Sequence, residues 1–214
     1  MGFLREEDKE YLRNEFKKRL KREVELLHFT DKNDNSDYLQ SSKALLEELV
    51  ELNGYLTLTV KDCSDRAELE SEGLLMCPAT KIKSSRKGFI NFYGIPAGYE
   101  FSGFVEDIID MGSDNLPLPD DVVLALSKID EPIDIKVFIT SACPYCVKAV
   151  RTAHLFSLAN DNVRASMIDA YGFSDLAREH NVSSVPHIVV NDRVSFVGAL
   201  PEKEFLYRIM ESIR

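Results

Sequence analysis

The sequence predicts an α/β protein built from two similar units, each with a central mixed β-sheet flanked by helices. Two observations lead to this fold class. Short apolar runs rich in β-branched residues alternate with longer runs in which apolar residues recur at a helical spacing. The same order of runs then occurs twice in 214 residues, a length that allows one large domain or two of about 100 residues.

The first unit, residues 1–115, begins with a charged amphipathic segment. Strands are predicted where β-branched and aromatic residues dominate a short run, and helices where apolar residues recur every three or four positions. The polar run 31–37 predicts a turn, Ser41-Ser42 precedes the second helix, and Asn53-Gly54 stops it. The expected order is helix 4–21, strand 24–30, helix 43–52, strand 55–60, short helix 66–72, strands 76–82 and 89–93 joined as a hairpin, and helix 97–110.

The second unit, residues 116–214, follows a predicted junction at 111–119 and repeats this order. The repeat is visible in residues as well as in pattern: Phe92-Tyr93-Gly94 matches Phe196-Val197-Gly198, Cys77-Pro78 matches Val185-Pro186, and His28-Phe29-Thr30 matches Phe138-Ile139-Thr140. We therefore interpret the chain as a tandem duplication. The expected order is helix 120–129, strand 133–140, helix 146–159, strand 163–168, short helix 174–180, strands 185–190 and 194–197, and helix 202–213.

Cys143-Pro144-Tyr145-Cys146 stands between a predicted strand and a predicted helix, a context typical of a dithiol redox motif. Side chains three residues apart share one face of a helix, so the two sulfurs can meet. Pro144 suits a first helical turn, because a proline there loses no helical hydrogen bond. The helix N-terminus favours a thiolate at Cys143, and cysteines so placed have pKa values lowered to roughly 3.5–7.5.

Composition and charge argue against several classes of protein. The formal net charge is −10, which disfavours a nucleic-acid partner because binding to phosphates needs a basic surface. The apolar runs are short and interrupted by charges, so no membrane partner or membrane-spanning helix is predicted. The charged N-terminus lacks the apolar core of a signal peptide, so we expect a cytoplasmic protein.

The dithiol after the strand and Val185-Pro186 ahead of a hairpin together resemble the thioredoxin/glutaredoxin fold. That resemblance implies a cis proline at Pro186 that lies against the dithiol. Two such units in one chain resemble the protein disulfide oxidoreductases of thermophilic archaea and bacteria, over nearly the whole length.

The sequence departs from that family in its first unit. The family's usual Cys-x-x-Cys would fall on 33–36 or 36–39, and neither segment contains a cysteine. We therefore expect the first unit to have lost its dithiol and the activity to depend on the second. Thioredoxins also carry a buried acid six residues before the nucleophile, where this chain has Val137, so the second unit is more similar to a glutaredoxin.

The resemblance implies a thiol–disulfide oxidoreductase that acts on protein cysteines, with a redox-active Cys143–Cys146 disulfide and no bound cofactor. Cys143 would attack and Cys146 would resolve the mixed disulfide. Pro144, Tyr145, Val185 and Pro186 would contact the substrate, and a reductase of the thioredoxin-reductase type would supply electrons. Two alternatives stay open: a glutathione-dependent glutaredoxin, and a peptide-binding or chaperone-like module.

The remaining cysteines and histidines allow several interpretations. The chain has four cysteines, so a Cys₄ metal site is arithmetically possible, although the strand–turn–helix context favours redox chemistry and we expect no metal. Cys63 and Cys77 are interpreted as small buried apolar residues or, alternatively, as a second disulfide. His187 either biases the thiolate or points elsewhere, and the other three histidines are interpreted as structural.

Overall fold

The first unit follows the predicted order of elements. The computed structural model describes residues 3–31 and 37–213 of the chain. The elements of its first part are α1 (Glu6–Arg19), β1 (Val24–Thr30), α2 (Asp37–Val50), β2 (Leu56–Asp62), α3 (Arg66–Ser71), β3 (Ala79–Ser84), β4 (Ile90–Tyr93) and α4 (Glu100–Gly112). Helix α2 begins earlier than Ser41-Ser42 indicated, and Ser42 is buried inside it rather than preceding it. A pair of serines therefore does not mark the start of a helix when the neighbouring residues bury a continuous helix face.

The second unit also follows the predicted order, with bounds that differ by a few residues. Its elements are α5 (Asp120–Leu126), β5 (Ile133–Ile139), α6 (Cys146–Ala159), β6 (Val163–Asp169), α7 (Ser174–Glu179), β7 (His187–Val190), β8 (Val194–Val197) and α8 (Glu202–Ser212). The α/β class with tandem units, each part of a mixed sheet flanked by helices, is confirmed. The boundary between residues 115 and 116 stays a prediction.

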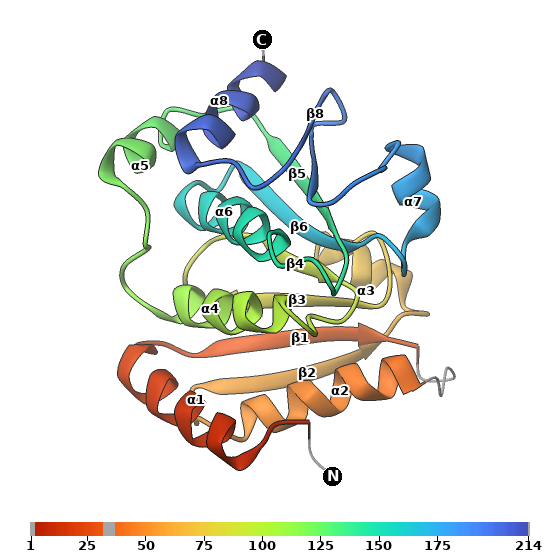
Figure 1. The fold of residues 1–214 in the computed structure, drawn as a ribbon. Helices are drawn as coiled ribbons and strands as arrows, with labels where there is room; N and C mark the ends of the chain where they lie inside the picture. Colours follow the sequence, from red (N-terminus) through yellow and green to blue (C-terminus); the bar gives the residue numbers. More distant parts are fainter. Residues whose placement is uncertain (1–2, 32–36, 214) are drawn as a thin grey trace.

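One eight-stranded mixed sheet runs through both units in the order β2-β1-β3-β4-β6-β5-β7-β8 (Figure 1). Strand β4 of the first unit pairs in parallel with β6 of the second, with Phe92 opposite Met167. The sequence predicted a sheet in each unit but not that the two would join edge to edge. Joining them covers one edge strand of each unit, which otherwise would present unpaired backbone groups.

Helices cover both faces of this sheet, as Figure 1 shows. The larger apolar cluster contains residues of α1, α2, α4, α5, α6 and α8, among them Phe16, Leu46, Phe104 and Phe156. The smaller cluster lies under α3 and α7 and contains Phe29 and Phe138. None of the helices in the described part of the chain is long and apolar enough to cross a membrane.

The sheet register corrects one part of the predicted repeat. Phe29 pairs with Ala79, and Phe138 pairs with His187, so Phe29 corresponds to Phe138. The match of His28-Phe29-Thr30 to Phe138-Ile139-Thr140 was wrong by one residue, because two short β-favouring runs align equally well by eye at either offset. The matches at Pro78 with Pro186 and Tyr93 with Val197 agree with the register.

Candidate redox-active site

Cys143 lies in the loop between β5 and α6, and Cys146 is the first residue of α6. The amide of Cys143 donates to the carbonyl of Thr140 at 3.0 Å, and the amide of Cys146 donates to the carbonyl of Cys143 at 3.3 Å. These bonds fold the loop into a tight turn. The two sulfurs are joined as a disulfide, with the Cα atoms 5.5 Å apart. The turn therefore brings together the two cysteines that the sequence singled out.

The two cysteines differ in exposure. Cys143 is 8% exposed and Cys146 is fully buried, whereas Tyr145 between them is 74% exposed. Helix α6 begins at Cys146, so Pro144 lies in the exposed turn before the helix and not in its first turn as predicted. A thiol reaching the pair from solvent meets Cys143 first, while Cys146 faces the interior.

Val185 and Pro186 precede β7, which pairs with β5 next to the dithiol loop. The Val185–Pro186 peptide bond is cis, as the resemblance implied. Val185 is half-buried and packs against the apolar cluster that also contains Cys143 and Cys146. The arrangement brings the four predicted contact residues, Pro144, Tyr145, Val185 and Pro186, to the same edge of the sheet; their roles stay predictions.

Sequence analysis missed Glu100, the first residue of α4. Its side chain is 1% exposed, and neither carboxyl oxygen has a hydrogen-bond partner among the described residues. Burial, followed by the negative charge of Asp107, raises the pKa of Glu100 to about 8. An acid with that pKa holds its proton at neutral pH and can exchange it near physiological pH.

Three observations place the start of α4, where Glu100 stands, beside the dithiol loop and the start of α6. The amide of Tyr99, one residue before Glu100, donates to the carbonyl of Ser141 at 3.4 Å. One turn later, a Cβ added at Gly103 would lie 3.1 Å from Val147, the residue after Cys146. Positions 100, 103 and 107 share a helix face, and Asp107 contacts Arg151 of α6. Glu100 therefore belongs to the face of α4 that packs along α6. It stands at the end of this face that is directed toward the start of α6, at Cys146.

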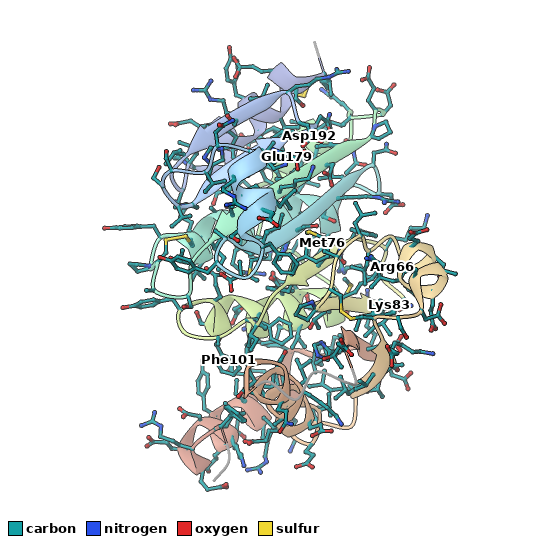
Figure 2. All side chains as sticks on the ribbon, turned by 90° about the vertical axis from the view of Figure 1, so that its right-hand side faces the viewer. Arg66, Met76, Lys83, Phe101, Glu179 and Asp192 are labelled. Atoms are coloured by element: carbon teal, nitrogen blue, oxygen red, sulfur yellow. A yellow bond between two sulfur atoms is a disulfide. The ribbon has the colours of Figure 1, made fainter. Side chains whose placement is uncertain are left out.

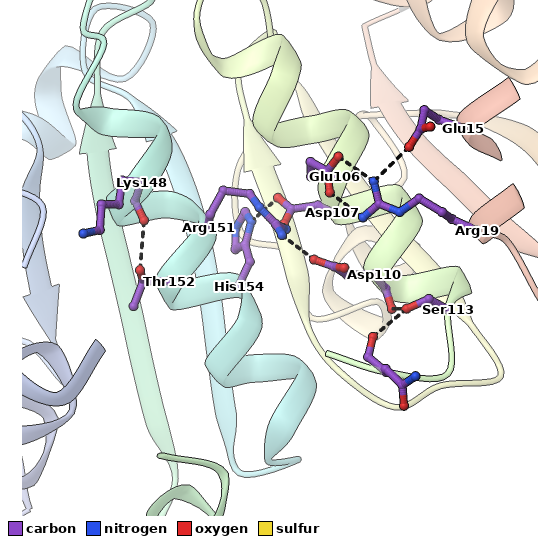
Figure 3. Close-up of polar contacts among 11 residues, drawn as sticks. Glu15, Arg19, Glu106, Asp107, Asp110, Ser113, Lys148, Arg151, Thr152 and His154 are labelled. Atoms are coloured by element: carbon purple, nitrogen blue, oxygen red, sulfur yellow. Dashed lines mark hydrogen bonds and ion pairs between the residues drawn. The ribbon is translucent and has the colours of Figure 1, made fainter. Parts of the chain in front are cut away.

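A buried group of charges joins α4 to α6 (Figure 3). Arg151 forms ion pairs with Asp107 and Asp110, and Nδ1 of His154 lies 2.6 Å from a carboxyl oxygen of Asp107. The side chains of Asp107 and His154 are completely buried. The interaction holds the helix that begins with Cys146 against the helix that begins with Glu100.

The first unit has no cysteine at the position of the dithiol. Helix α2 begins at Asp37 as α6 begins at Cys146, so by count residue 34 corresponds to Cys143. Residues 32–36, which include the predicted segment 33–36, lie outside the described part of the chain, as do the side chains of 37–39. Only the amino-acid sequence therefore supports the loss of the first dithiol.

The four cysteines form two separate pairs. Cys63 and Cys77 are joined as a second disulfide, with Cα atoms 6.1 Å apart, so the disulfide interpretation of this pair is correct. Both are half-buried and pack beside the smaller apolar cluster, whereas Cys143 and Cys146 belong to the larger one. In the described residues, no group of three or more His, Cys, Asp or Glu side chains could hold a metal ion.

His187 lies on the opposite face of the sheet from the dithiol. Its ring contacts Phe138, a member of the smaller cluster, with centroids 6.3 Å apart. Burial, followed by the charge of His180, lowers the pKa of His187. The interpretation that His187 points away from the thiolate therefore agrees with its contacts.

Comparison with known proteins gives relatives with the same architecture. Residues 133–211 match the family described as Thioredoxin domain. The alkyl hydroperoxide reductase protein AhpF from Pseudomonas aeruginosa is 27% identical over 176 residues, which are 82% of this chain and 32% of that protein. The corresponding protein of Staphylococcus aureus is 25% identical over 160 residues, 74% of this chain and 31% of that protein. The chain thus spans about a third of the length of the curated relatives it matches.

Solved structures match nearly the whole chain, among them the following two. A protein disulfide oxidoreductase from Aeropyrum pernix K1 superposes with a TM-score of 0.85 at 27% identity, covering 97% of this chain and 93% of that one. The NTD_N/C domain of alkylhydroperoxide reductase AhpF from Enterococcus faecalis superposes with a TM-score of 0.87 at 23% identity, covering 97% and 100%. The chain is therefore a tandem thioredoxin-fold protein, similar to an archaeal protein disulfide oxidoreductase, and its second unit has the fold and the joined Cys-x-x-Cys pair of a thiol–disulfide oxidoreductase.

Proposed function

We propose that this protein exchanges disulfides with the cysteines of other proteins through Cys143 and Cys146. The observation that carries the proposal is the asymmetry of the joined pair. Cys143 retains some exposure beside the exposed Tyr145, while Cys146 is completely buried behind it. An attacking and a resolving thiol need this difference, because only the first must reach a partner sulfur.

In the reducing direction, the Cys143 thiolate attacks one sulfur of a substrate disulfide. A bond forms between the two sulfurs, and the other substrate sulfur leaves as a thiolate that takes up a proton. Cys146 then loses its proton and attacks Cys143. The substrate leaves as a dithiol, reduced by two electrons, and Cys143 and Cys146 are oxidised to a disulfide. The reverse sequence oxidises a substrate dithiol.

We assign to Glu100 the role of accepting and returning the proton of Cys146. A completely buried thiol cannot give its proton to bulk water directly, and Glu100 is the buried acid on the face of α4 that leads to Cys146. A carboxyl group with a pKa of about 8 is ionised in a minor fraction of the molecules at neutral pH, and this ionised form can accept the proton of Cys146 and later return it. It takes the place of the buried acid that thioredoxins carry where this chain has Val137.

Exposed aromatic side chains frame the place where a substrate would dock. Tyr145 and Tyr99 are both exposed. Phe101 and Gly98 line a groove between α1 and the start of α4, and Gly98 lies close to Ser141 of the dithiol loop. The backbone of Val185 precedes β7 and can pair with an extended substrate chain. These features fit a protein substrate better than a small thiol, because they offer contacts over a surface.

We further propose that the exchange takes place in the cytoplasm, needs no bound cofactor, and receives electrons from a reductase of the thioredoxin-reductase type. The names of the curated relatives support only the transfer of electrons: these relatives are alkyl hydroperoxide reductase proteins.

An insulin reduction assay tests the proposal. Cys143→Ser should abolish turnover, and Cys146→Ser should leave a mixed disulfide between Cys143 and the substrate that mass spectrometry detects. If glutathione alone reduces this protein as fast as NADPH and a thioredoxin reductase do, the result would favour a glutaredoxin. A chaperone-like module would be favoured if the native chain had no reductase activity and the Cys143→Ser variant protected an unfolding protein as well as the native chain does.

A further inference from the structure

We propose that the Cys63–Cys77 disulfide of the first unit is a second redox-active site, which accepts two electrons from a protein dithiol. The inference goes beyond the exchange proposed for Cys143 and Cys146. It starts from position: Cys77 precedes β3 as Val185 precedes β7, and Cys63 follows β2 as Ala170 follows β6. The amides of Cys63 and Ala170 donate to the equivalent carbonyls of Thr30 and Ile139.

Strand directions place both disulfides at the same edge of the sheet. β1 is antiparallel to β3, β3 is antiparallel to β4, and β4 and β5 are both parallel to β6. β1 and β5 therefore run in the same direction, and their carboxyl ends meet the same edge. The two pairs belong to different apolar clusters, so each occupies its own face at that edge. Figure 2 draws disulfides as yellow bonds between sulfur atoms and labels Met76, the residue before Cys77.

Cys63 and Cys77 lie in a partly exposed part of the first unit, which another protein could approach. Both residues are half-buried rather than enclosed, and residues 64–67 after Cys63 are exposed. Leu75, two residues before Cys77, is 71% exposed. Disulfides that stay accessible exchange more readily than buried ones, because thiol–disulfide exchange requires a thiolate to approach the sulfur in line.

The contacts of the two sulfurs assign the order of the exchange. The sulfur of Cys77 lies 3.5 Å from the carbonyl oxygen of Phe29, on the interior side, whereas Cys63 opens the exposed segment. The thiolate of the partner attacks the sulfur of Cys63, and the Cys63–Cys77 bond breaks as Cys77 leaves and takes up a proton. The second thiol of the partner then attacks its own mixed disulfide, and Cys63 leaves as a thiol. The partner is oxidised to a disulfide by two electrons, and this pair is reduced to two thiols.

The segment between the two cysteines has anchors that do not depend on the disulfide. The amide of Leu75 donates to the hydroxyl of Tyr93 at 3.2 Å, and Lys81 donates to the carbonyl of Glu72 at 2.6 Å. Leu69 of α3 is completely buried. These contacts can keep the segment folded when the sulfurs part, as reversible redox chemistry requires.

Two matched variants separate the sites. Cys143→Ser/Cys146→Ser retains only Cys63–Cys77, and Cys63→Ser/Cys77→Ser retains only the other pair. Each is equilibrated with graded mixtures of reduced and oxidised dithiothreitol, alkylated, and weighed intact. We expect Cys63–Cys77 to gain two thiols per chain, with an equilibrium constant within about 100-fold of that of Cys143–Cys146. A value more than about 10⁴-fold further toward the disulfide overturns the proposal.

Two further measurements complete the test. Brief exposure to glutathione followed by acid quenching should leave the glutathione adduct on Cys63, and an adduct confined to Cys77 overturns the assigned order. Circular dichroism of the reduced Cys143→Ser/Cys146→Ser variant should match that of the oxidised form. Unfolding on reduction would make Cys63–Cys77 a structural cross-link and overturn the proposal, while leaving the function proposed for Cys143 and Cys146 untouched.

Discussion

Replacing Arg151 with methionine tests the buried charges between α4 and α6. Methionine retains much of the apolar stem of arginine but removes the guanidinium that pairs with Asp107 and Asp110. The side chains of these aspartates are 0% and 3% exposed, so water cannot replace the lost partner. Removing one member of a buried ion pair typically costs about 3–5 kcal/mol, because an uncompensated charge stays buried. We expect Arg151→Met to lose stability in that range.

The loss should depend on pH. Without Arg151, burial raises the pKa of Asp110 in the folded state further above its ordinary value in the unfolded chain. The folded variant then binds more protons than the unfolded chain above that ordinary value, so its stability falls as the pH rises through this window. In the native chain burial already raises the pKa of Asp110, but Arg151 opposes that rise, so the slope is smaller than in the variant. The difference between the two proteins should therefore be larger at pH 8 than at pH 5.

Urea unfolding of the oxidised proteins measures the effect as a shift of the midpoint at constant slope. Arg178→Met is the matched control, because Arg178 pairs with Asp175 on the surface, with side chains 79% and 89% exposed. Such a pair contributes about 0–1 kcal/mol. The triple variant Arg151→Met/Asp107→Asn/Asp110→Asn should recover part of the loss, since it leaves no buried charge at these positions. A loss below about 1 kcal/mol for Arg151→Met would refute this reasoning.

Three other predictions use the same unfolding measurement. The pKa of Glu100 is raised to about 8 in the folded protein, so stability should fall by up to about 1.4 kcal/mol per pH unit as the pH rises toward 8. Glu100→Gln should remove that slope. Parallel slopes in the native protein and the variant would contradict this prediction. Burial lowers the pKa of His28 to about 4, so protonation of the unfolded chain should reduce stability as the pH falls from about 6.5 to 4, and His28→Asn should lessen the loss. Gly98→Ala should lower stability by about 1–3 kcal/mol, because φ is +64° and a Cβ would lie 2.6 Å from the carbonyl oxygen of Ser141. Gly54 has open space around it, so the control Gly54→Ala should change stability by less than about 1 kcal/mol. Equal losses in the two variants would contradict the steric argument.

Local patterns were sufficient to predict the order of the elements and the dithiol. The β-branched run before Cys143 and the apolar spacing after Cys146 encode a strand and a helix by themselves, so the turn between them follows. The element ends were less predictable. Helix α2 begins at Asp37 and not after Ser42, because burial of one helix face outweighs the turn preference of short polar residues.

Contacts between distant segments could not be predicted from local patterns. Glu100 looks like an ordinary first-turn acid of a helix, and only tertiary packing buries it and so raises its pKa. The partners of His154 and Arg151 lie in the other unit, so the spacing within α6 gives no sign of them. The pairing of Cys63 with Cys77 likewise depends on the meeting of the ends of β2 and β3, and both a disulfide and two separate buried cysteines fitted the sequence.

The loss of a Cys-x-x-Cys in the first unit does not make that unit an inert copy. Its last helix contributes Glu100 and the aspartates that bind Arg151, and its last strand pairs with β6. The dithiol belongs to the second unit alone, but its supporting residues come from both. Substitutions in α4 should therefore alter the reactivity of Cys146, although α4 contains no cysteine. This dependence gives a physical reason for the duplicated chain to retain both units while the chemistry proposed for Cys143 and Cys146 uses the sulfurs of only one.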